Sequence, residues 1–233
     1  WMDRCKEQID GKINRRIFTR TIKQMIHDFD TLELVGDGTK PRVGVVGEIL
    51  VKFHPTANNG IVDIIEKEGC ECVVPGITEF FLFGISGGIW QHRQLTKPLK
   101  SEIGTRFSLG FINAWRAPLI RALKKSKRFH APANIYELAD YAQEILSLCN
   151  SMGEGWLLTA EMVELIKTGA PNIVCTQPFA CLPNHVTGKG VIKELRRRHP
   201  ESNIVAVDYD PGASEVNQLN RIKLMISVAK ANF

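Results

Sequence analysis

The sequence lacks any long uncharged apolar run. A membrane-spanning helix needs roughly 20 such residues, and the longest candidate, Phe80 to Trp90, is shorter and rich in glycine. Low-complexity linkers and internal repeats are also missing. We therefore expect no membrane-spanning helix and no repeat architecture, and the apolar fraction of 44% is that of an ordinary globular protein.

Motifs that identify common enzyme classes are absent as well. No Gly-x-Gly-x-x-Gly follows a predicted strand, which argues against a dinucleotide site of the Rossmann type. Gly188-Lys189-Gly190 lacks the earlier glycine and the following Ser or Thr of a Walker loop. No nucleophile elbow and no defensible order of Ser, His and Asp are found, so a stand-alone hydrolase is not expected.

The excess of positive charge is small. Thirty basic residues against 25 acidic ones give a formal net charge of +5. The two basic clusters, at 124–128 and 196–199, end helical patterns, where cations complement the helix dipole. Neither cluster is interleaved with aromatic side chains, as a nucleic-acid-binding surface would be. We interpret both as solvated helix ends and expect no nucleic-acid partner.

Six cysteines occur at irregular spacing, and no secretory leader is seen at the start. This usage is typical of a reducing compartment, and it predicts a cytoplasmic location. The sequence begins at Trp1 inside a helical pattern. It is therefore expected to be a segment of a longer protein.

Apolar periodicity predicts alternating helices and strands. A helical segment, residues 1–40, carries Ile9, Ile13, Ile17 and Ile22 at roughly helical spacing. A domain at 41–233 follows, with a helical insertion at about 100–152 and strands at Arg42–Val51, at Cys72–Val74, before Cys175 and at Ile204–Val207. This order predicts an α/β fold with a mainly parallel sheet and flanking helices, a flavodoxin-like or Rossmann-like lobe.

Residues Ile77 to Gln94 are aromatic and rich in glycine. The pattern leaves two alternatives for them, a mobile segment covering the crevice or an irregular connection.

The starts of two later helices are clearer in the sequence. Asn134 with Glu137 matches a capping box, and Ser214 precedes a last amphipathic helix.

Thiol, basic and acidic side chains follow the predicted strands. Loops beyond the carboxyl ends of parallel strands form the ligand crevice of such a sheet, so a site is expected there. The candidates are Cys175, Cys181, His185, Lys189, Asp208 and Asp210, together with Glu48 and His54 after the first strand.

Each candidate also has a structural interpretation. Cys175 and Cys181 could ligate a metal, although a cysteine at a strand end is usually buried. The residues Gly188, Lys189 and Gly190 could offer N–H groups and a lysine to an anion, or could form a tight turn.

The acidic candidates leave the same choice open. Asp208 and Asp210 could bind a divalent cation or could hydrogen-bond loop amides and the following helix. Glu48 could be a ligand or an acid–base group, or could hold the amides of a neighbouring loop.

Four phrases carry a family resemblance: QPFACLPNHVTGKG at 177–190, IVAVDYDPGASEVNQLNRIKL at 204–224, VGEILVKFHPTANNG at 46–60 and GEGWLLTAEM at 153–162. They resemble the carboxyl-terminal part of large proteins related to 2-hydroxyacyl-CoA dehydratase activases, also called CoA-substrate-specific enzyme activases. The resemblance covers most of the chain from about Pro41 onward.

The resemblance implies an iron–sulfur protein. In this family an actin-like ATPase domain precedes a region similar to the dehydratase subunits, which hold a 4Fe-4S cluster through three cysteines. Cys181 matches the late cluster cysteine, and Gln177, Asn184 and His185 would surround it and tune the cluster. Cys175 has no equally clear counterpart. A cluster is expected in the intact protein but not in this segment alone.

The implied activity is ATP-coupled delivery of low-potential electrons, or related reductive chemistry. The actin-like ATPase motifs are absent here, so the segment alone should be inactive while the parent protein acts as an ATP-dependent activase or reductase. Expected partners are the actin-like ATPase domain, an acyl-CoA dehydratase or acyl-CoA substrate, and a second copy in a homodimer. The alternative is a non-catalytic lobe that docks the ATPase domain or binds a CoA-like anion.

Overall fold

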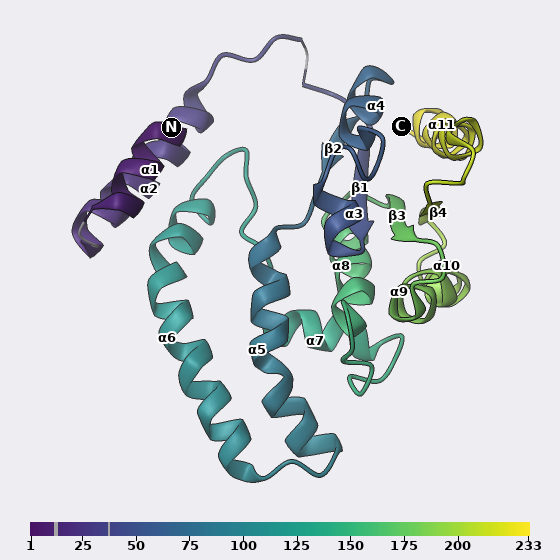
Figure 1. The fold of residues 1–233 in the computed structure, drawn as a ribbon. Helices are drawn as coiled ribbons and strands as arrows, with labels where there is room; N and C mark the ends of the chain where they lie inside the picture. The colour runs from purple at the N-terminus through teal and green to yellow at the C-terminus, as the bar shows by residue number, and fades with distance from the viewer. Residues whose placement is uncertain (12–13, 37) are drawn as a thin grey trace. The chain divides into compact units, whose positions relative to one another are not determined.

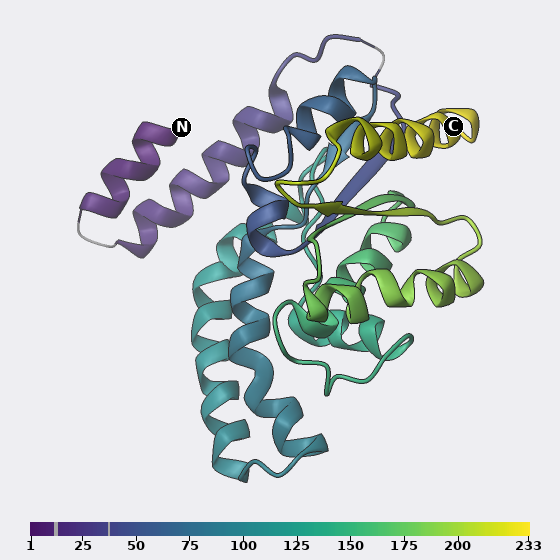
Figure 2. The same cartoon turned by 45° about the vertical axis from the view of Figure 1, so that its right-hand side comes forward.

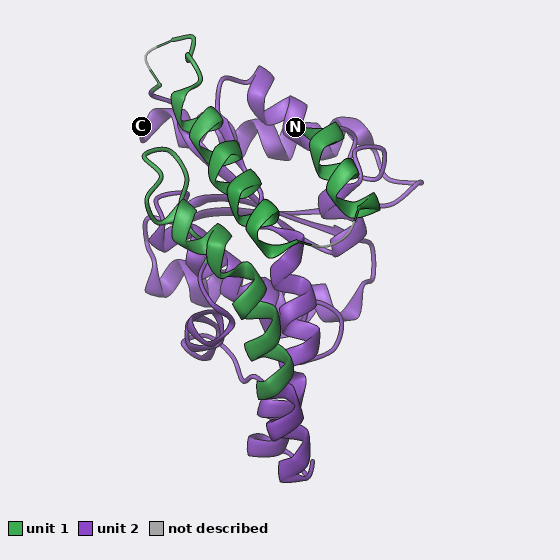
Figure 3. Cartoon of the chain, turned by 90° about the vertical axis from the view of Figure 1, so that its left-hand side faces the viewer, with its two compact units in different colours: residues 1–38, 106–132 green, residues 39–105, 133–233 purple. Residues whose placement is uncertain are grey.

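The structure, a computed structural model, describes residues 1–11, 14–36 and 38–233. It contains two compact units (Figure 3). The helical unit comprises Trp1–Gly38 and Arg106–Pro132, and the sheet unit comprises Thr39–Thr105 and Ala133–Phe233. Ile13, one of the predicted periodic apolar residues, lies outside the described part of the chain.

The sheet unit is built on four parallel strands (Figure 1). These are β1 (Arg42–Gly47), β2 (Glu71–Val73), β3 (Asn172–Pro178) and β4 (Asn203–Tyr209), in the order β2-β1-β3-β4. Val46 pairs with Cys175, and Thr176 pairs with Val207. The predicted α/β fold with a parallel sheet is confirmed.

Helices cover both faces of this sheet. Helices α4 (Ile61–Lys67) and α11 (Glu215–Ala231) pack with Val43, Val45 and Val174 in one core. Helices α8 (Gly155–Lys167) and α10 (Ile192–Arg198) pack with Ile173 and Cys175 in the other. Figure 2 shows α11, in yellow, on one side of β4 and α10, in light green, on the other. Both sides of β3 are apolar because alternate residues face opposite cores.

The first strand is shorter than predicted. It ends at Gly47 rather than Val51, and a short helix, α3 (Ile49–Phe53), follows. Gly47 has φ of 140°, and a Cβ there would lie 1.8 Å from the Thr176 carbonyl oxygen. Glu48 then caps α3 by accepting a hydrogen bond from the Val51 N–H at 2.9 Å. Only glycine permits this turn, which the continuous apolar run concealed.

Residues Ile77–Gln94 form one helix, α5, so the predicted irregular connection is wrong, and the alternative of a mobile segment covering the crevice stays a prediction. Its buried side chains include Leu82, Ser86 and Ile89, a spacing that presents one face of a helix to the core. Gly88 allows close approach of the following helix α6 (Leu99–Leu123), since a Cβ there would lie 2.2 Å from Thr105 Oγ1. Gly88 therefore serves helix packing, whereas a Cβ on Gly84 would meet nothing within 4 Å.

The predicted helix caps are confirmed. Asn134 and Glu137 form a complete capping box at the start of α7 (Ile135–Gln143). Ser214 accepts a hydrogen bond from the Asn217 N–H at the start of α11. Within the ranges that the structure describes, no helix is both long and apolar enough to span a membrane.

The helical unit contains α1 (Met2–Asp10), α2 (Arg15–Thr31) and the part of α6 from Arg106 onward. Asn14 caps α2 through hydrogen bonds from the N–H groups of Arg16 and Ile17. Phe18 and Trp115 meet edge to face, with ring centroids 6.3 Å apart. Among the buried apolar side chains of the described residues, only Ile26 and Leu109 belong to this unit.

Candidate functional site

The candidate site lies beyond the carboxyl end of β3. The segment predicted as a loop is instead a short helix, α9 (Leu182–Thr187), followed by a single 3-10 turn, η1 (Lys189–Val191). Cys181 precedes the first residue of α9. Proline is tolerated near a helix start, where its missing N–H has no acceptor to lose, and Pro183 stands in this first turn.

Asp208, at the end of β4, is the hub of the site. Its Oδ1 accepts a hydrogen bond from Gln177 Nε2 at 2.6 Å, and its Oδ2 lies 3.0 Å from Lys189 Nζ. His185 Nε2 is 3.9 Å from the same carboxylate. Burial alone would raise the pKa of Asp208, but the hydrogen bonds from Gln177 and Lys189 outweigh it and lower that pKa. Asp208 therefore stays ionised near neutral pH.

Gln177 contributes an unused acceptor to this group. Its side chain is fully buried, and its Oε1 has no hydrogen-bond partner among the described residues. Gln218, which the sequence did not single out, donates from Nε2 to the Asp208 carbonyl oxygen at 2.9 Å. Asn59 in turn donates to Gln218 Oε1 at 3.0 Å. The site therefore extends across the sheet edge to α11 and the loop before α4.

The two cysteines have different environments. Cys175 is fully buried in the core, and burial raises the pKa of its thiol to about 12. Since metals are ligated by the thiolate, this burial disfavours Cys175 as a ligand. Cys181 is partly exposed, and its carbonyl oxygen lies 2.9 Å from His185 Nδ1. Of the two predicted metal ligands, only Cys181 lies at the accessible end of β3.

Close packing explains why glycine occupies the positions on either side of Lys189. A Cβ on Gly188 would lie 2.7 Å from the Asn184 carbonyl oxygen and 3.0 Å from Cys175 Sγ. A Cβ on Gly190 would lie 2.9 Å from the His185 carbonyl oxygen. These contacts explain the glycines without an anion, and Lys189 has a counter-charge in Asp208.

Asn184 belongs to a second, neighbouring cluster. Its amide, oriented from the hydrogen-bonding network, donates to Glu154 Oε2 at 2.5 Å and accepts from the Glu48 N–H at 2.9 Å. Glu154 Oε1 also accepts from the Ile49 N–H at 3.1 Å. Burial raises the pKa of Glu154. Glu154 was not predicted, and its position between two glycines before α8 was the only signal in the sequence.

Two predicted crevice residues are not part of either cluster. His54 is exposed and ends α3, where its N–H donates to the Leu50 carbonyl. Asp210 is also exposed, and its carbonyl accepts from the Ala213 N–H at 2.9 Å. Both residues shape turns, because the chain carries them past the strand ends into solvent.

A buried ion pair lies in the core of the sheet unit. Lys52 Nζ is 2.9 Å from Glu161 Oε1, and both side chains are almost fully buried. Lys52 follows β1 and Glu161 lies on α8, 109 residues away in the sequence. The sequence offered no signal for this pairing.

The described residues do not form a complete metal centre. Throughout 1–11, 14–36 and 38–233, no group of three or more His, Cys, Asp or Glu side chains is arranged to hold a metal ion.

Comparisons with models of protein families, with curated proteins and with solved structures found no match.

Proposed function

We propose that this chain is a lobe of an iron–sulfur protein related to 2-hydroxyacyl-CoA dehydratases and their activases, serving low-potential electron transfer or reductive chemistry. The supporting observation is the position of Cys181, a partly exposed thiol directly after β3 and beside the charged group around Asp208. Thiolates are the usual ligands of iron–sulfur clusters.

Cys181 would supply one ligand only. The described residues do not form a complete cluster shell, so the remaining ligands would come from another domain or another chain. His185 and Lys189 would place positive or neutral hydrogen-bonding groups near the cluster edge, and Asp208 would hold both in position. Such surrounding groups tune reduction potential.

The test is anaerobic reconstitution, with iron and sulfide, of the intact protein that contains this chain, followed by iron and sulfide analysis and a visible absorption spectrum. Wild-type protein should bind both elements and show broad charge-transfer absorption, because the other domain or chain supplies the remaining ligands. Cys181→Ser should abolish the absorption. Cys149→Ser is the matched control because Cys149 is an exposed cysteine away from β3. Equal iron in both variants, or none in wild type, would count against the proposal.

A second candidate function is anion binding or docking at the outer edge of β4. A pocket of about 430 Å³ lies there, and its lining includes the cations Lys189, Lys193, Arg196 and Arg221. Lys193 and Arg221 form no ion pair within the described residues. Titration calorimetry with CoA, comparing wild type with Lys193→Gln/Arg221→Gln, tests this role, and absence of binding to wild type would eliminate the CoA-like ligand.

A further inference from the structure

The helical unit carries most of the chain's excess of positive charge. Residues 106–132 contain seven basic residues and no acidic one. Helix α2 adds Arg15, Arg16, Arg20 and Lys23. The sequence alone suggested solvated helix ends for the 124–128 cluster, but the structure brings part of it opposite α2.

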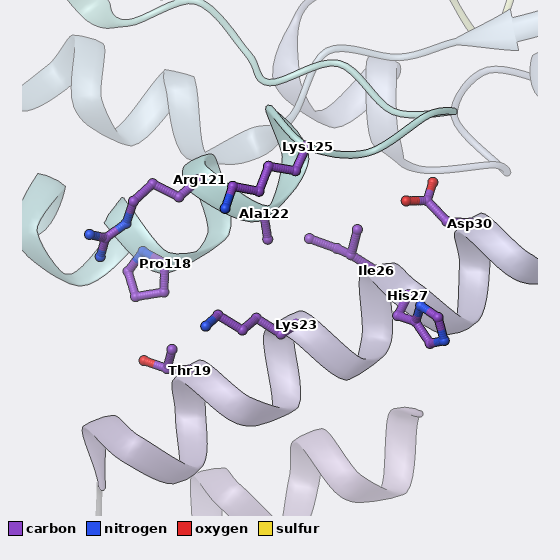
Figure 4. Close-up of a pocket in the computed structure, with 9 residues that line it drawn as sticks. All are labelled: Thr19, Lys23, Ile26, His27, Asp30, Pro118, Arg121, Ala122 and Lys125. Atoms are coloured by element: carbon purple, nitrogen blue, oxygen red, sulfur yellow. The ribbon is translucent and has the colours of Figure 1, made fainter.

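Basic side chains from the two segments border one hollow (Figure 4). It has a volume of about 570 Å³, and its lining includes Lys23 and His27 of α2 and Arg121 and Lys125 at the end of α6. A second hollow of about 820 Å³ shares Lys23 and continues along α2 past Arg20 and Arg16. We call the two together the cationic groove, defined by Arg16, Arg20, Lys23, Arg121 and Lys125.

Three cations of α2 are aligned along one face. Arg16, Arg20 and Lys23 are spaced by four and three residues, and such positions are neighbours on a helix surface. Like charges at this spacing are mutually destabilising. Lys23 also shares a hollow with Arg121 and Lys125, which adds to the repulsion that a bound anion would relieve.

Few acidic side chains of the protein offset the positive charge of the groove. In the described part of the chain, none of the five groove cations forms an ion pair. Arg121 Nε donates only to the Ala117 carbonyl oxygen. The acidic residue in the lining, Asp30, accepts a hydrogen bond from Ser126 Oγ at 2.6 Å, which lowers the pKa of Asp30. Asp30 is thus engaged by the turn after α6 rather than by Lys23.

The chemistry of the groove selects its ligand. Arginine matches phosphate oxygens with its planar fork, and lysine adds a compact charge. Among the described residues, no Phe, Tyr or Trp lines either hollow, so these residues offer contacts to charge rather than stacking for a base. We propose that the cationic groove binds a chain of two or more phosphates, carried either on a small phosphorylated molecule or on a nucleic-acid backbone.

Tripolyphosphate and a fluorescently labelled oligothymidylate are the probes for the two sources. The dissociation constant of each probe is measured at about 50 and 150 mM salt. A variant that has lost phosphate contacts should show a smaller change in affinity between the two salt concentrations. The groove variant is Lys23→Gln/Lys125→Gln. Its matched control is Lys97→Gln/Lys100→Gln, which removes the same charge from exposed side chains of the sheet unit. Circular dichroism verifies that all variants are folded.

The groove variant should weaken binding by about tenfold and reduce the salt dependence, whereas the control should bind as wild type does. Binding of tripolyphosphate alone would identify a small phosphorylated ligand, and binding of the oligonucleotide alone would identify a nucleic-acid strand. The proposal is overturned if wild type binds neither probe at the lower salt, or if the groove variant binds no more weakly than the control.

Discussion

At the scale of single residues, function depends on which polar groups the fold isolates from water. Asp208 is held by Gln177 and Lys189, so its charge is stabilised at the strand end. Cys175, two residues before Gln177, loses its reactivity to burial. Residues two apart face the same side of a strand, so their chemistry differs along β3: Cys175 lies within the core, whereas Gln177 lies at the strand end and donates to Asp208.

The buried carboxyl of Glu161 gives a pH-dependent prediction. Burial raises its pKa to about 7 from a usual value of 4.5, although Lys52 partly offsets the shift. The folded state then holds the proton more tightly than the unfolded state. The contribution of Glu161 to stability is complete below about pH 4.5 and is lost as the pH rises through about 7.

Urea denaturation of wild type and Glu161→Gln from pH 4.5 to 7 tests this. Relative to the variant, the free energy of unfolding of wild type should fall by on the order of 3 kcal/mol with rising pH. Glu33→Gln, which alters an exposed side chain, should follow wild type. A constant difference between wild type and Glu161→Gln would contradict the expected proton uptake.

At the scale of elements, short helices after the strands position the site. Helix α3 presents Glu48 and α9 presents Asn184, and Glu154 at the start of α8 joins them. Such short helices are marginal alone and depend on tertiary contacts. The contact of α9 with β3 through Gly188 is therefore a point where packing controls the site.

Gly188→Ala should disturb this contact. The new methyl group would meet Asn184, Leu158 and Cys175 at 2.7 to 3.0 Å, and overpacking of this kind costs about 1 to 3 kcal/mol. Thermal and urea denaturation would measure the loss. Gly84→Ala in α5 is the control, since a Cβ there meets nothing within 4 Å, and it should stabilise the protein by about 0.5 to 1 kcal/mol. Equal effects of both substitutions would refute the packing role of Gly188.

At the scale of the whole molecule, the two units differ in how much apolar surface they bury. The sheet unit has two apolar cores, one on each face of the sheet. The helical unit contributes only Ile26 and Leu109 to the buried apolar side chains of the described residues. Segments with few buried apolar contacts open more readily than core strands.

Hydrogen–deuterium exchange should separate the units. Amides of β1, β3 and α8 should exchange only through global unfolding, while those of α1 and α2 should exchange many times faster. Saturating tripolyphosphate should slow exchange in α2 if the cationic groove binds it, because a ligand of the folded state stabilises that state. Uniform protection across both units would show that they unfold together.

Local sequence patterns predict the parallel strands and the capped helices α7 and α11, but they do not predict the end of β1 at Gly47 or the helices α3, α5 and α9. Strand composition, the capping box at Asn134 and the cap at Ser214 act within a few residues, so they can be interpreted locally. The strand-end argument placed His185, Lys189 and Asp208 at one edge of the sheet, since the carboxyl ends of parallel strands meet there.

Which distant side chains come into contact follows from tertiary packing alone. Lys52 meets Glu161 across 109 residues, and the Ile49 N–H meets Glu154 across 105. It also separated the buried Cys175 from the accessible Cys181, and it brought the basic end of α6 opposite α2. Such pairings depend on the angles at which distant elements pack. Hydrophobic periodicity in the sequence shows which face of an element is buried, but it does not specify the packing angle or the partner.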